Sequence, residues 1–406
     1  MNTLDVRRAR IALAHLVEPG SRALGLLVAG VGPVEALARL RAGEVSDELR
    51  AAAAPRLTEV DPDQQVDRAL ARAQRLGVRI VTPEDEEWPG HLDQLALISV
   101  PGTDRIRRDT FPPHCVWLRG EPGLAEACER SVAVVGARAS TSYGDHVAGE
   151  LAFGLAERGW TIVSGGAYGI DAAAHRGALA AGGCTVAVLA CGIDRPYPAA
   201  HAALFDRIAD CGLLLSEWPP GSDPHRHRFL VRNRVIAAAT LGTLVVEANV
   251  RSGARNTLGR ARLLSRVLMA VPGPVTSAMS VGCHEEMRQG DVVVVATLAH
   301  VLDAVGRIGV DLAPVVRAEE SPRDRLTALQ QQVLDGVRPR KVLGAEQIAA
   351  AVGVSEQDAR RTLPALELAG FVTAVDGGYR LRRKSDPPWL GQPVDLGTLF
   401  PESGNS

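Results

Sequence analysis

The stretch from Thr161 to Pro198 constrains the fold more than any other part of this sequence. Two short apolar runs, Thr161–Val163 and Thr185–Leu189, are typical of strands that are buried on both faces of a sheet. Between them, Ile170–Ala181 is rich in alanine and contains no proline, so it favours a helix. Two strands joined through one helix must be parallel, with a right-handed crossover. The stretch therefore predicts one unit of a parallel α/β sheet.

A glycine-rich turn, Ser164–Gly169, lies between the first of these strands and the helix. Open α/β sheets bind ligands at the carboxyl ends of their strands. Free N–H groups and the helix dipole attract an anion there, and glycine lets a ligand approach the backbone closely. We therefore expect Ser164, Gly165, Gly166 and Gly169 to form part of an anion site.

The composition limits the classes of protein to consider. With 406 residues and 46% hydrophobic residues, the chain can form two or three domains with a large core. The formal net charge is -2, so any nucleic-acid site must arise from local clustering of basic residues. No signal-peptide core and no apolar run of spanning length occur, so we expect a cytoplasmic protein with no membrane partner. The six cysteines form no C-x-x-C pair, which favours reduced thiols over metal ligands.

Strand and helix patterns alternate along residues 125–306 and predict a doubly wound, Rossmann-like, mostly parallel α/β sheet. Its expected strands are Val132–Val135, Thr161–Val163, Val186–Leu189, Leu213–Leu215, Leu244–Val246, Leu268–Val271 and Val292–Val295. Residues 1–75 are expected to be helical with a break at Gly30–Pro33. This pattern is similar to a SAM or helix-hairpin-helix module, and a plain helical bundle explains it too. Residues 76–124 are expected to form a connecting extension with short strands.

The C-terminal part of the chain predicts a second, smaller unit. Residues 307–324 contain prolines and charges and are expected to be a linker. Residues 325–383 show three helical patterns followed by a hairpin, which predicts a winged helix. Arg360 and Arg361 would project from its third helix as candidates for contact with duplex DNA. Residues 384–406 are expected to be a disordered tail.

A second turn, at Val135–Ser140, places Arg138 and Ser140 at the same edge of the predicted sheet as the glycine-rich turn. It lacks the G-x-G-x-x-G pattern, and no acidic residue is placed to hold a ribose, so we expect no dinucleotide cofactor. One alternative is a plain strand–helix turn with a surface arginine. The two adjoining turns together favour an anion site.

A basic cluster lies between Pro224 and Arg266, where nine arginines face a single acid, Glu247. The arginines are Arg226, Arg228, Arg232, Arg234, Arg251, Arg255, Arg260, Arg262 and Arg266. Several of them flank Phe229, an arrangement that suits single-stranded nucleic acid, because arginine neutralises phosphate and the ring stacks on a base. An equally weighted alternative places Phe229 in the core and the arginines on a solvated helix face.

Catalysis has little support in the sequence. Asp171, Asp194, Glu217 and Glu247 lie near predicted strand ends, and none is paired in sequence with a nucleophile. Asp171 is expected to orient the first turn of its helix. One alternative function is a nucleotide hydrolase that releases the base from a nucleoside monophosphate with the help of Glu247. A weaker alternative is a transcription regulator whose winged helix reads duplex DNA.

A series of motifs from about residue 80 to residue 300 resembles the DprA/Smf family of bacterial DNA-processing proteins. The motifs are Val135–Arg138, Ser164–His175, Gly192–Pro198, Ser216–Gly221, Phe229 with Arg232–Arg234, Val246–Ala248, Ser252–Ala254, Val271–Gly273 and Gly282–Cys283. The helical module and the winged helix are similar to those of the longer members of this family.

The resemblance implies a single-stranded DNA binder without catalytic activity. Such a protein would dimerise through the Rossmann-like domain, protect incoming DNA during transformation and load the RecA recombinase. By position, Arg138 matches the family's phosphate-contacting arginine. Arg226 and Phe229 match a basic residue and a base-stacking aromatic, with Arg232 and Arg234 beside them. Tyr168 stands where many members carry arginine.

Overall fold

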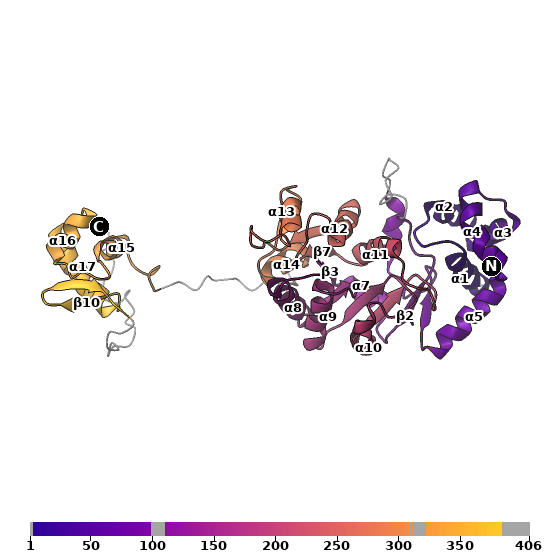
Figure 1. Cartoon of the computed structure of the whole chain (residues 1–406), viewed down its shortest axis with the longest axis horizontal. Coiled ribbons are helices and arrows are strands. Elements are labelled where there is room, and N and C mark those ends of the chain that lie inside the picture. Colours follow the sequence, from indigo (N-terminus) through magenta and orange to yellow (C-terminus); the bar gives the residue numbers. More distant parts are fainter. Residues whose placement is uncertain (1–2, 99–109, 308–309, 312–321, 384–406) are drawn as a thin grey trace. The chain divides into compact units, whose positions relative to one another are not determined.

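The computed structural model describes residues 3–98, 110–307, 310–311 and 322–383 of the chain. The chain forms two compact units, Met1–Pro314 and Val315–Ser406 (Figure 1). The predicted disordered tail, residues 384–406, lies outside the described residues. So does most of the predicted linker, residues 307–324.

The larger unit is built on a nine-stranded sheet with the order β1-β2-β6-β5-β4-β3-β7-β8-β9 (Figure 1). The strands from β6 to β9 in this order pair in parallel, and β2 and β1 add an antiparallel edge next to β6. The strands are β1 (Arg79–Val81), β2 (Val116–Arg119), β3 (Ser131–Val135), β4 (Thr161–Ser164), β5 (Thr185–Leu189), β6 (Leu213–Ser216), β7 (Gly242–Val245), β8 (Val267–Ala270) and β9 (Val293–Val294).

The α/β class and the mostly parallel sheet predicted from the sequence are confirmed. Each strand expected between residues 125 and 306 is present, with ends within two residues of the prediction. The strands β1 and β2 come from the segment expected as a connecting extension, and they pair with the same sheet rather than forming one of their own.

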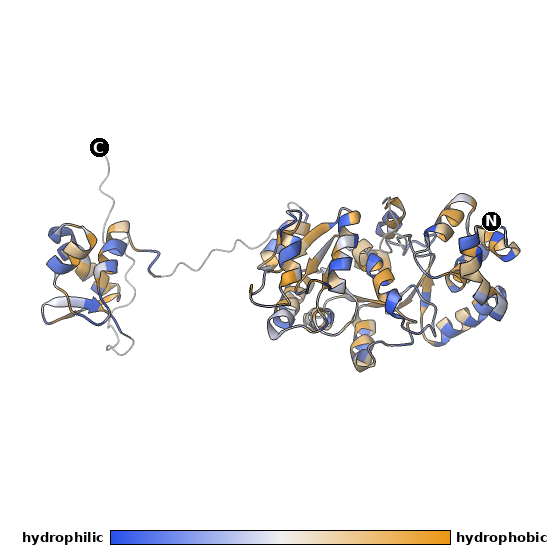
Figure 2. Cartoon of the chain, turned by 45° about the horizontal axis from the view of Figure 1, so that its top comes forward, coloured by the Kyte–Doolittle hydropathy of each residue, from blue (hydrophilic) through white to orange (hydrophobic). Residues whose placement is uncertain are grey.

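Alternation along β3 shows how the sheet is buried on both faces. Val132 and Val134 pack with one set of helices, whereas Ala133 and Val135 pack with another, as the two-residue period of a strand requires. The helices that pack with Val132 and Val134 are α8 (Ser142–Ala156), α9 (Ile170–Ala180) and α14 (Leu298–Val305). Those that pack with Ala133 and Val135 include α7 (Leu124–Glu129), α11 (Arg226–Ala238) and α12 (Gly253–Leu263). The strands between these two layers are coloured predominantly hydrophobic in Figure 2.

The N-terminal helices share a third core with β2, β5, β6 and α10 (Ala202–Cys211), in which Ile11 and Trp117 are fully buried. They are α1 (Thr3–Leu16), α2 (Arg22–Val31), α3 (Pro33–Ala42), α4 (Asp47–Glu59) and α5 (Pro62–Arg75). Gly32, at φ +80°, separates α2 from α3, as the predicted break requires. The remaining elements are the 3-10 helices η1 (Gly90–Leu97) and η2 (Ala199–His201) and the helix α13 (Val281–Met287).

Among the described residues, no single helix is both long and apolar enough to cross a membrane. The pair α2 and α3, bent by 119°, would pass such a test only when taken together and on length and composition alone.

The smaller unit has its own core, formed by side chains that include Val333, Ile348 and Leu363. Its elements are α15 (Ala328–Gly336), α16 (Ala345–Val352), α17 (Glu356–Leu368), β10 (Val372–Val375) and β11 (Gly378–Leu381). Asp376 and Gly377 have positive φ angles of 45° and 79° and turn β10 into β11, as expected of a two-residue hairpin loop. Three helices followed by a hairpin are therefore present where the sequence predicts them.

Candidate nucleic-acid interface

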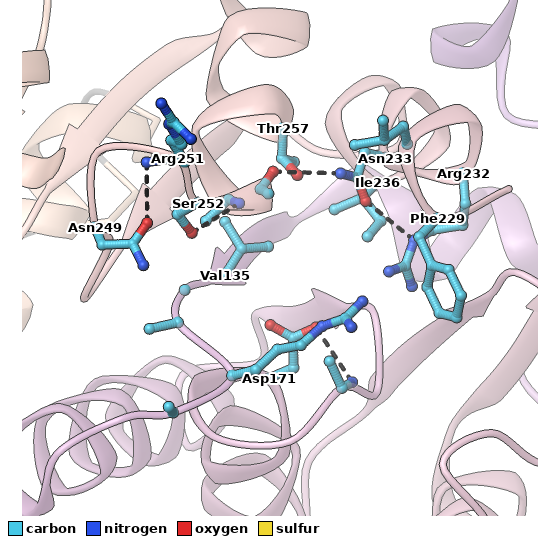
Figure 3. Close-up of a pocket in the computed structure, with 18 of the residues that line it drawn as sticks. Val135, Asp171, Phe229, Arg232, Asn233, Ile236, Asn249, Arg251, Ser252 and Thr257 are labelled. Atoms are coloured by element: carbon cyan, nitrogen blue, oxygen red, sulfur yellow. Dashed lines mark hydrogen bonds between the residues drawn. The ribbon is translucent and has the colours of Figure 1, made fainter. Parts of the chain in front are cut away.

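A pocket of about 870 Å³ lies at the carboxyl ends of the parallel strands. The strand order reverses around β3, because β4 lies on one side of it and β7 on the other. The turns that follow these strands therefore diverge and leave a crevice, which is where doubly wound sheets bind ligands. The walls come from the turns after β3, β4 and β7, the loop after β5, and the helices α11 and α12 (Figure 3).

The pocket brings together four of the predicted site residues: Arg138, Arg226, Phe229 and Arg232. The guanidinium carbon of Arg138 lies 5.1 Å from the centroid of the Phe229 ring, which is a cation–π arrangement. Phe229 is half-buried and packs on one side against a small cluster that includes Trp218 and Val231. Phe229 therefore contacts the interior and also lines the pocket, and its stacking on a base stays a prediction.

Three exposed arginines, Arg138, Arg226 and Arg251, line the pocket. Within the described part of the chain, no carboxylate lies within ion-pair distance of any of these three guanidinium groups. Asp171 is the acidic residue of the pocket lining, and its side chain is buried. The mouth of the pocket is therefore positively charged and can bind an anionic ligand.

Arg232 and Asp171 form a buried polar layer below this mouth. Arg232 donates hydrogen bonds to the carbonyl oxygens of Gly165, at 2.8 Å, and Val188. Burial lowers the pKa of Arg232 to about 10, so it remains charged at neutral pH. Burial raises the pKa of Asp171, and the nearby Arg232 charge opposes this shift. Arg232 thus ties the glycine-rich turn to β5 from within, and it is only 5% exposed.

The glycine-rich turn does not present a phosphate cradle as the sequence led us to expect. The N–H groups of Gly165 and Ala167 already donate to one oxygen of Asp171, at 3.2 and 3.3 Å. Ser164 is fully buried and donates to the carbonyl oxygen of Val134. Gly166 is also buried, and a Cβ atom there would meet the Phe205 ring at 2.4 Å. An internal carboxylate occupies the anion position of this turn, so Ser164, Gly165 and Gly166 shape the pocket without lining it.

Gly169 and Ser140 lie near the pocket but do not line it. Gly169 has a φ of +75°, and a Cβ atom there would lie 2.4 Å from the carbonyl oxygen of Ala137. Its close approach joins the turns after β3 and β4. The hydroxyl of Ser140 donates to Asp145 in the first turn of α8.

Tyr168 is 49% exposed, and its ring packs edge-on against His201 with centroids 4.7 Å apart.

Most of the arginine cluster has a structural role, so the cluster counted in the sequence is neither wholly a binding surface nor a solvated helix face. Arg234 is fully buried and pairs with Glu217 at 2.7 Å, so it cannot contact a ligand. Arg228 is buried and pairs with Glu18 at 2.7 Å. Arg255 and Arg262 are partly buried and both pair with Glu286. Arg266 is partly buried and donates to a backbone carbonyl, and Arg260 is buried. Only Arg226 and Arg251 of the nine are exposed.

Sequence reasoning did not place Tyr197, Asn249 or Ser252 in the site, although it counted Arg251 in the basic cluster. Tyr197 is 45% exposed, and its ring centroid lies 5.5 Å from that of Phe229, with the planes tilted by 58°. Asn249, Arg251 and Ser252 line the opposite wall, where the N–H of Arg251 donates to Asn249 (Figure 3). The available signal was positional, since both segments directly follow predicted parallel strands.

Glu247 does not have the geometry of a catalytic base for nucleotide hydrolysis. Its two oxygens accept hydrogen bonds from the N–H and the hydroxyl of Thr141, at 2.9 and 2.7 Å. It is 2% exposed and is absent from the pocket lining. Glu247 therefore fastens the start of α8 to the end of β7. The described residues also contain no group of three or more metal-ligating side chains arranged to hold a metal ion.

Comparisons with known proteins identify the family of the chain. Residues 79–306 match the family model described as DNA recombination-mediator protein A. A putative DNA processing protein DprA from Mycobacterium tuberculosis is 44% identical over 380 residues, which cover 93% of this chain and 94% of the relative. Protein Smf from Escherichia coli is 32% identical over 326 residues, or 79% of this chain and 82% of the relative.

A solved structure, that of DNA processing protein A (DprA) from Streptococcus pneumoniae, has the same fold. It superposes with a TM-score of 0.60 at 27% identity, covering 76% of this chain and all of that one. The family model spans more than half of the chain, and the sequence relatives span most of it. The chain therefore belongs to the DprA/Smf family of DNA recombination-mediator proteins, which act in DNA processing.

Proposed function

We propose that this protein binds single-stranded DNA in the pocket at the carboxyl edge of its sheet and acts there as a recombination mediator without catalytic activity. The observation that carries this proposal is that Arg138, Arg226 and Arg251 line the same pocket as the ring of Phe229, with Arg138 directly over that ring. Three exposed cations without acidic partners in the described chain suit consecutive phosphates, and the ring suits an unpaired base.

The position of the ring favours a single strand over a duplex. Phe229 is half-buried inside the pocket, so a base must leave its helical stack to reach the ring. A base in a single strand does this at little cost, whereas a paired base must first break its pair. Tyr197, 5.5 Å from Phe229, extends the aromatic surface toward a neighbouring base. The site needs no sequence-specific contact, because every base has a face that can stack.

The wider role follows from the family and is part of the same proposal. The protein would protect incoming single strands in the cytoplasm, load RecA onto them and dimerise through the Rossmann-like domain, residues 125–306. Residues 1–75 would form a SAM-like module, followed by the extension 76–124. Residues 325–383 would form a winged helix. RecA-catalysed strand exchange on strands covered by a single-strand-binding protein should accelerate when this protein is added, and no acceleration would contradict the loading role.

The binding proposal is tested with the double variant Arg138→Ala/Phe229→Ala. Loss of stacking alone should cost about 1–3 kcal/mol, or about 5- to 150-fold in affinity for single-stranded DNA. For the wild-type protein, three phosphate contacts predict that log K falls with log salt at a slope of about -2, and the variant should lose about one third of this slope. Fluorescence anisotropy with a labelled oligonucleotide measures both quantities.

A matched control removes the same residue types elsewhere. Phe153→Ala/Arg207→Ala replaces a partly exposed phenylalanine of α8 and an exposed arginine of α10, neither of which lines the pocket. This control should bind as the wild type does. Equal affinities of the pocket variant and the wild type would show that the strand binds elsewhere.

A further inference from the structure

Two basic runs stand out in the smaller unit. The first, Arg338-Pro339-Arg340-Lys341, lies between α15 and α16, and the second, Arg380-Leu381-Arg382-Arg383, begins in β11. Neither run contains an acidic residue. Each run is only four residues long, and the two runs are far apart in the sequence.

The fold places the two runs side by side. Leu343 and Tyr379 form an antiparallel bridge in which each N–H donates to the other's carbonyl oxygen, at 3.0 and 2.8 Å. The N–H of Leu381 donates to the carbonyl oxygen of Arg338 at 3.3 Å. The guanidinium of Arg383 donates to the carbonyl oxygen of Pro339, also at 3.3 Å. Pro339 is the residue between Arg338 and Arg340, so the Arg383 charge reaches the first run. The first run is therefore held against β11 at its start, through Arg338 and Pro339, and just beyond its end, through Leu343.

This arrangement concentrates like charges. Arg338, Arg340 and Lys341 are all exposed, and within the described residues no carboxylate lies at ion-pair distance from any of them. Like charges on adjacent strands destabilise a sheet unless a counter-charge is present. No described carboxylate supplies this counter-charge to the first run, so the arrangement fits an anionic partner from outside.

The third helix, α17, is less suited to that partner. It carries three acids, Glu356, Asp358 and Glu367, against Arg360 and Arg361. The Nε of Arg360 donates to Glu356 at 2.8 Å, and Asp358 accepts from the hydroxyl of Ser355 at 2.6 Å. Arg360 and Arg361, the residues expected to contact DNA, therefore lie on a helix with a net negative charge, which disfavours binding of a phosphate backbone there.

We propose that the basic edge, defined as Arg338, Arg340, Lys341, Arg380, Arg382 and Arg383, binds the phosphodiester backbone of nucleic acid as a second site. It is independent of the pocket in the larger unit. Cations from two adjoining segments can neutralise several phosphates of one nucleic-acid backbone. An anionic membrane would favour apolar side chains that insert among the lipids. Within residues 338–342 and 380–383, Val342 is the large apolar side chain that is more than a third exposed.

The test measures duplex DNA binding by the full chain in the background Arg138→Ala/Phe229→Ala, in which the pocket is impaired. The edge variant is Arg338→Gln/Arg340→Gln/Lys341→Gln. Each phosphate contact contributes about 0.9 to the slope of log K against log salt, so the variant should lose about 2.7 of that slope. When the salt rises from 50 to 200 mM, the edge variant should therefore lose about 40-fold less affinity than the protein with the intact edge. The control Arg323→Gln/Arg360→Gln/Arg361→Gln removes the same charge from the same unit and should leave the slope within about 0.5 of its starting value.

The outcomes decide between the edge and α17. A lower slope for the edge variant alone supports the proposal. An unchanged slope for the edge variant, or an equal or larger loss in the control, overturns it. The proposal is also overturned if the edge variant loses affinity for vesicles with anionic headgroups while its DNA binding is unchanged. Should circular dichroism show that the edge variant is unfolded, the single changes Arg340→Glu and Arg361→Glu replace the two triple variants with the same criteria.

Discussion

Replacing Arg234 by methionine tests most sharply whether the buried arginines are structural. Sequence patterns place Arg234 with the DNA contacts, whereas the structure buries it completely and pairs it with Glu217 at 2.7 Å. Methionine has a similar length and can fill the space, so the main loss is the charge partner of Glu217.

The magnitude follows from what remains behind. Glu217 is 2% exposed, and one of its oxygens already has no hydrogen-bond partner within the structure. Breaking a buried ion pair by removing one member costs about 3–5 kcal/mol, because an uncompensated charge stays in the interior. The double variant Glu217→Leu/Arg234→Met removes both charges and should recover most of this loss.

The loss should also depend on pH. Burial raises the pKa of Glu217, and the attraction of Arg234 opposes this shift. Without Arg234 the pKa in the folded state rises further, whereas the unfolded state keeps the usual value near 4.5. An acid whose folded pKa is raised loses stability as the pH climbs from its unfolded pKa through its folded pKa. The deficit of Arg234→Met should therefore be larger at pH 8 than at pH 5.

Urea denaturation followed by circular dichroism at both pH values measures these quantities, and anisotropy at 10 °C measures DNA binding by the folded fraction. The reasoning predicts lower stability and wild-type affinity of the folded protein. It is refuted if Arg234→Met retains its stability and loses its affinity for single-stranded DNA. That outcome would return Arg234 to the binding surface.

Three further changes probe other parts of the structure. Tyr197→Ala should weaken single-strand binding by about 1 kcal/mol or more while leaving duplex binding unchanged, as measured by anisotropy. Gly169→Ala should destabilise the protein by more than about 1 kcal/mol in urea denaturation, because φ is +75° and the new Cβ meets a carbonyl oxygen. Burial opposes ionisation of Glu18, but hydrogen bonds from Arg228 and Trp218 lower its pKa to about 2. This stabilisation is present above about pH 4.5 and is lost as the pH falls toward 2, so Glu18→Gln should show a flatter stability profile between pH 5 and 3, by about 1 kcal/mol after solvent screening. A profile parallel to that of the wild type would contradict this role of Glu18.

The sheet could be predicted because its signals are local. The run Thr185–Leu189 and the alanine-rich segment before it state their preferences within a few residues, and parallel pairing then follows from chain connectivity. The same holds for the smaller unit, where Asp376-Gly377 marks the hairpin turn.

The roles of the arginines could not be predicted because their partners are remote in the sequence. Glu18 pairs with Arg228 across 210 positions, and Glu286 reaches back to Arg255 and Arg262. A count of charges within one window therefore finds a basic cluster where the fold has a set of internal ion pairs. Only the structure separates Arg226 and Arg251, which remain exposed, from the rest.

The glycine-rich turn shows a different limit. Its glycines, its place after a strand and its helix were all correctly identified, and Asp171 was expected to orient the first turn of that helix. The carboxylate of Asp171 instead reaches back to the N–H groups of Gly165 and Ala167 and fills the anion position itself. The pattern alone does not distinguish a turn that awaits a phosphate from a turn that supplies its own anion.

The central claim is that the pocket at the carboxyl edge of the sheet selects single strands through Phe229 and the exposed arginines that line the same pocket. Competition between single- and double-stranded DNA of the same sequence for the full chain tests it most directly. The wild-type protein should prefer the single strand by about tenfold or more, and Arg138→Ala/Phe229→Ala should remove most of that preference. An equal preference in the wild type and the variant would contradict the claim.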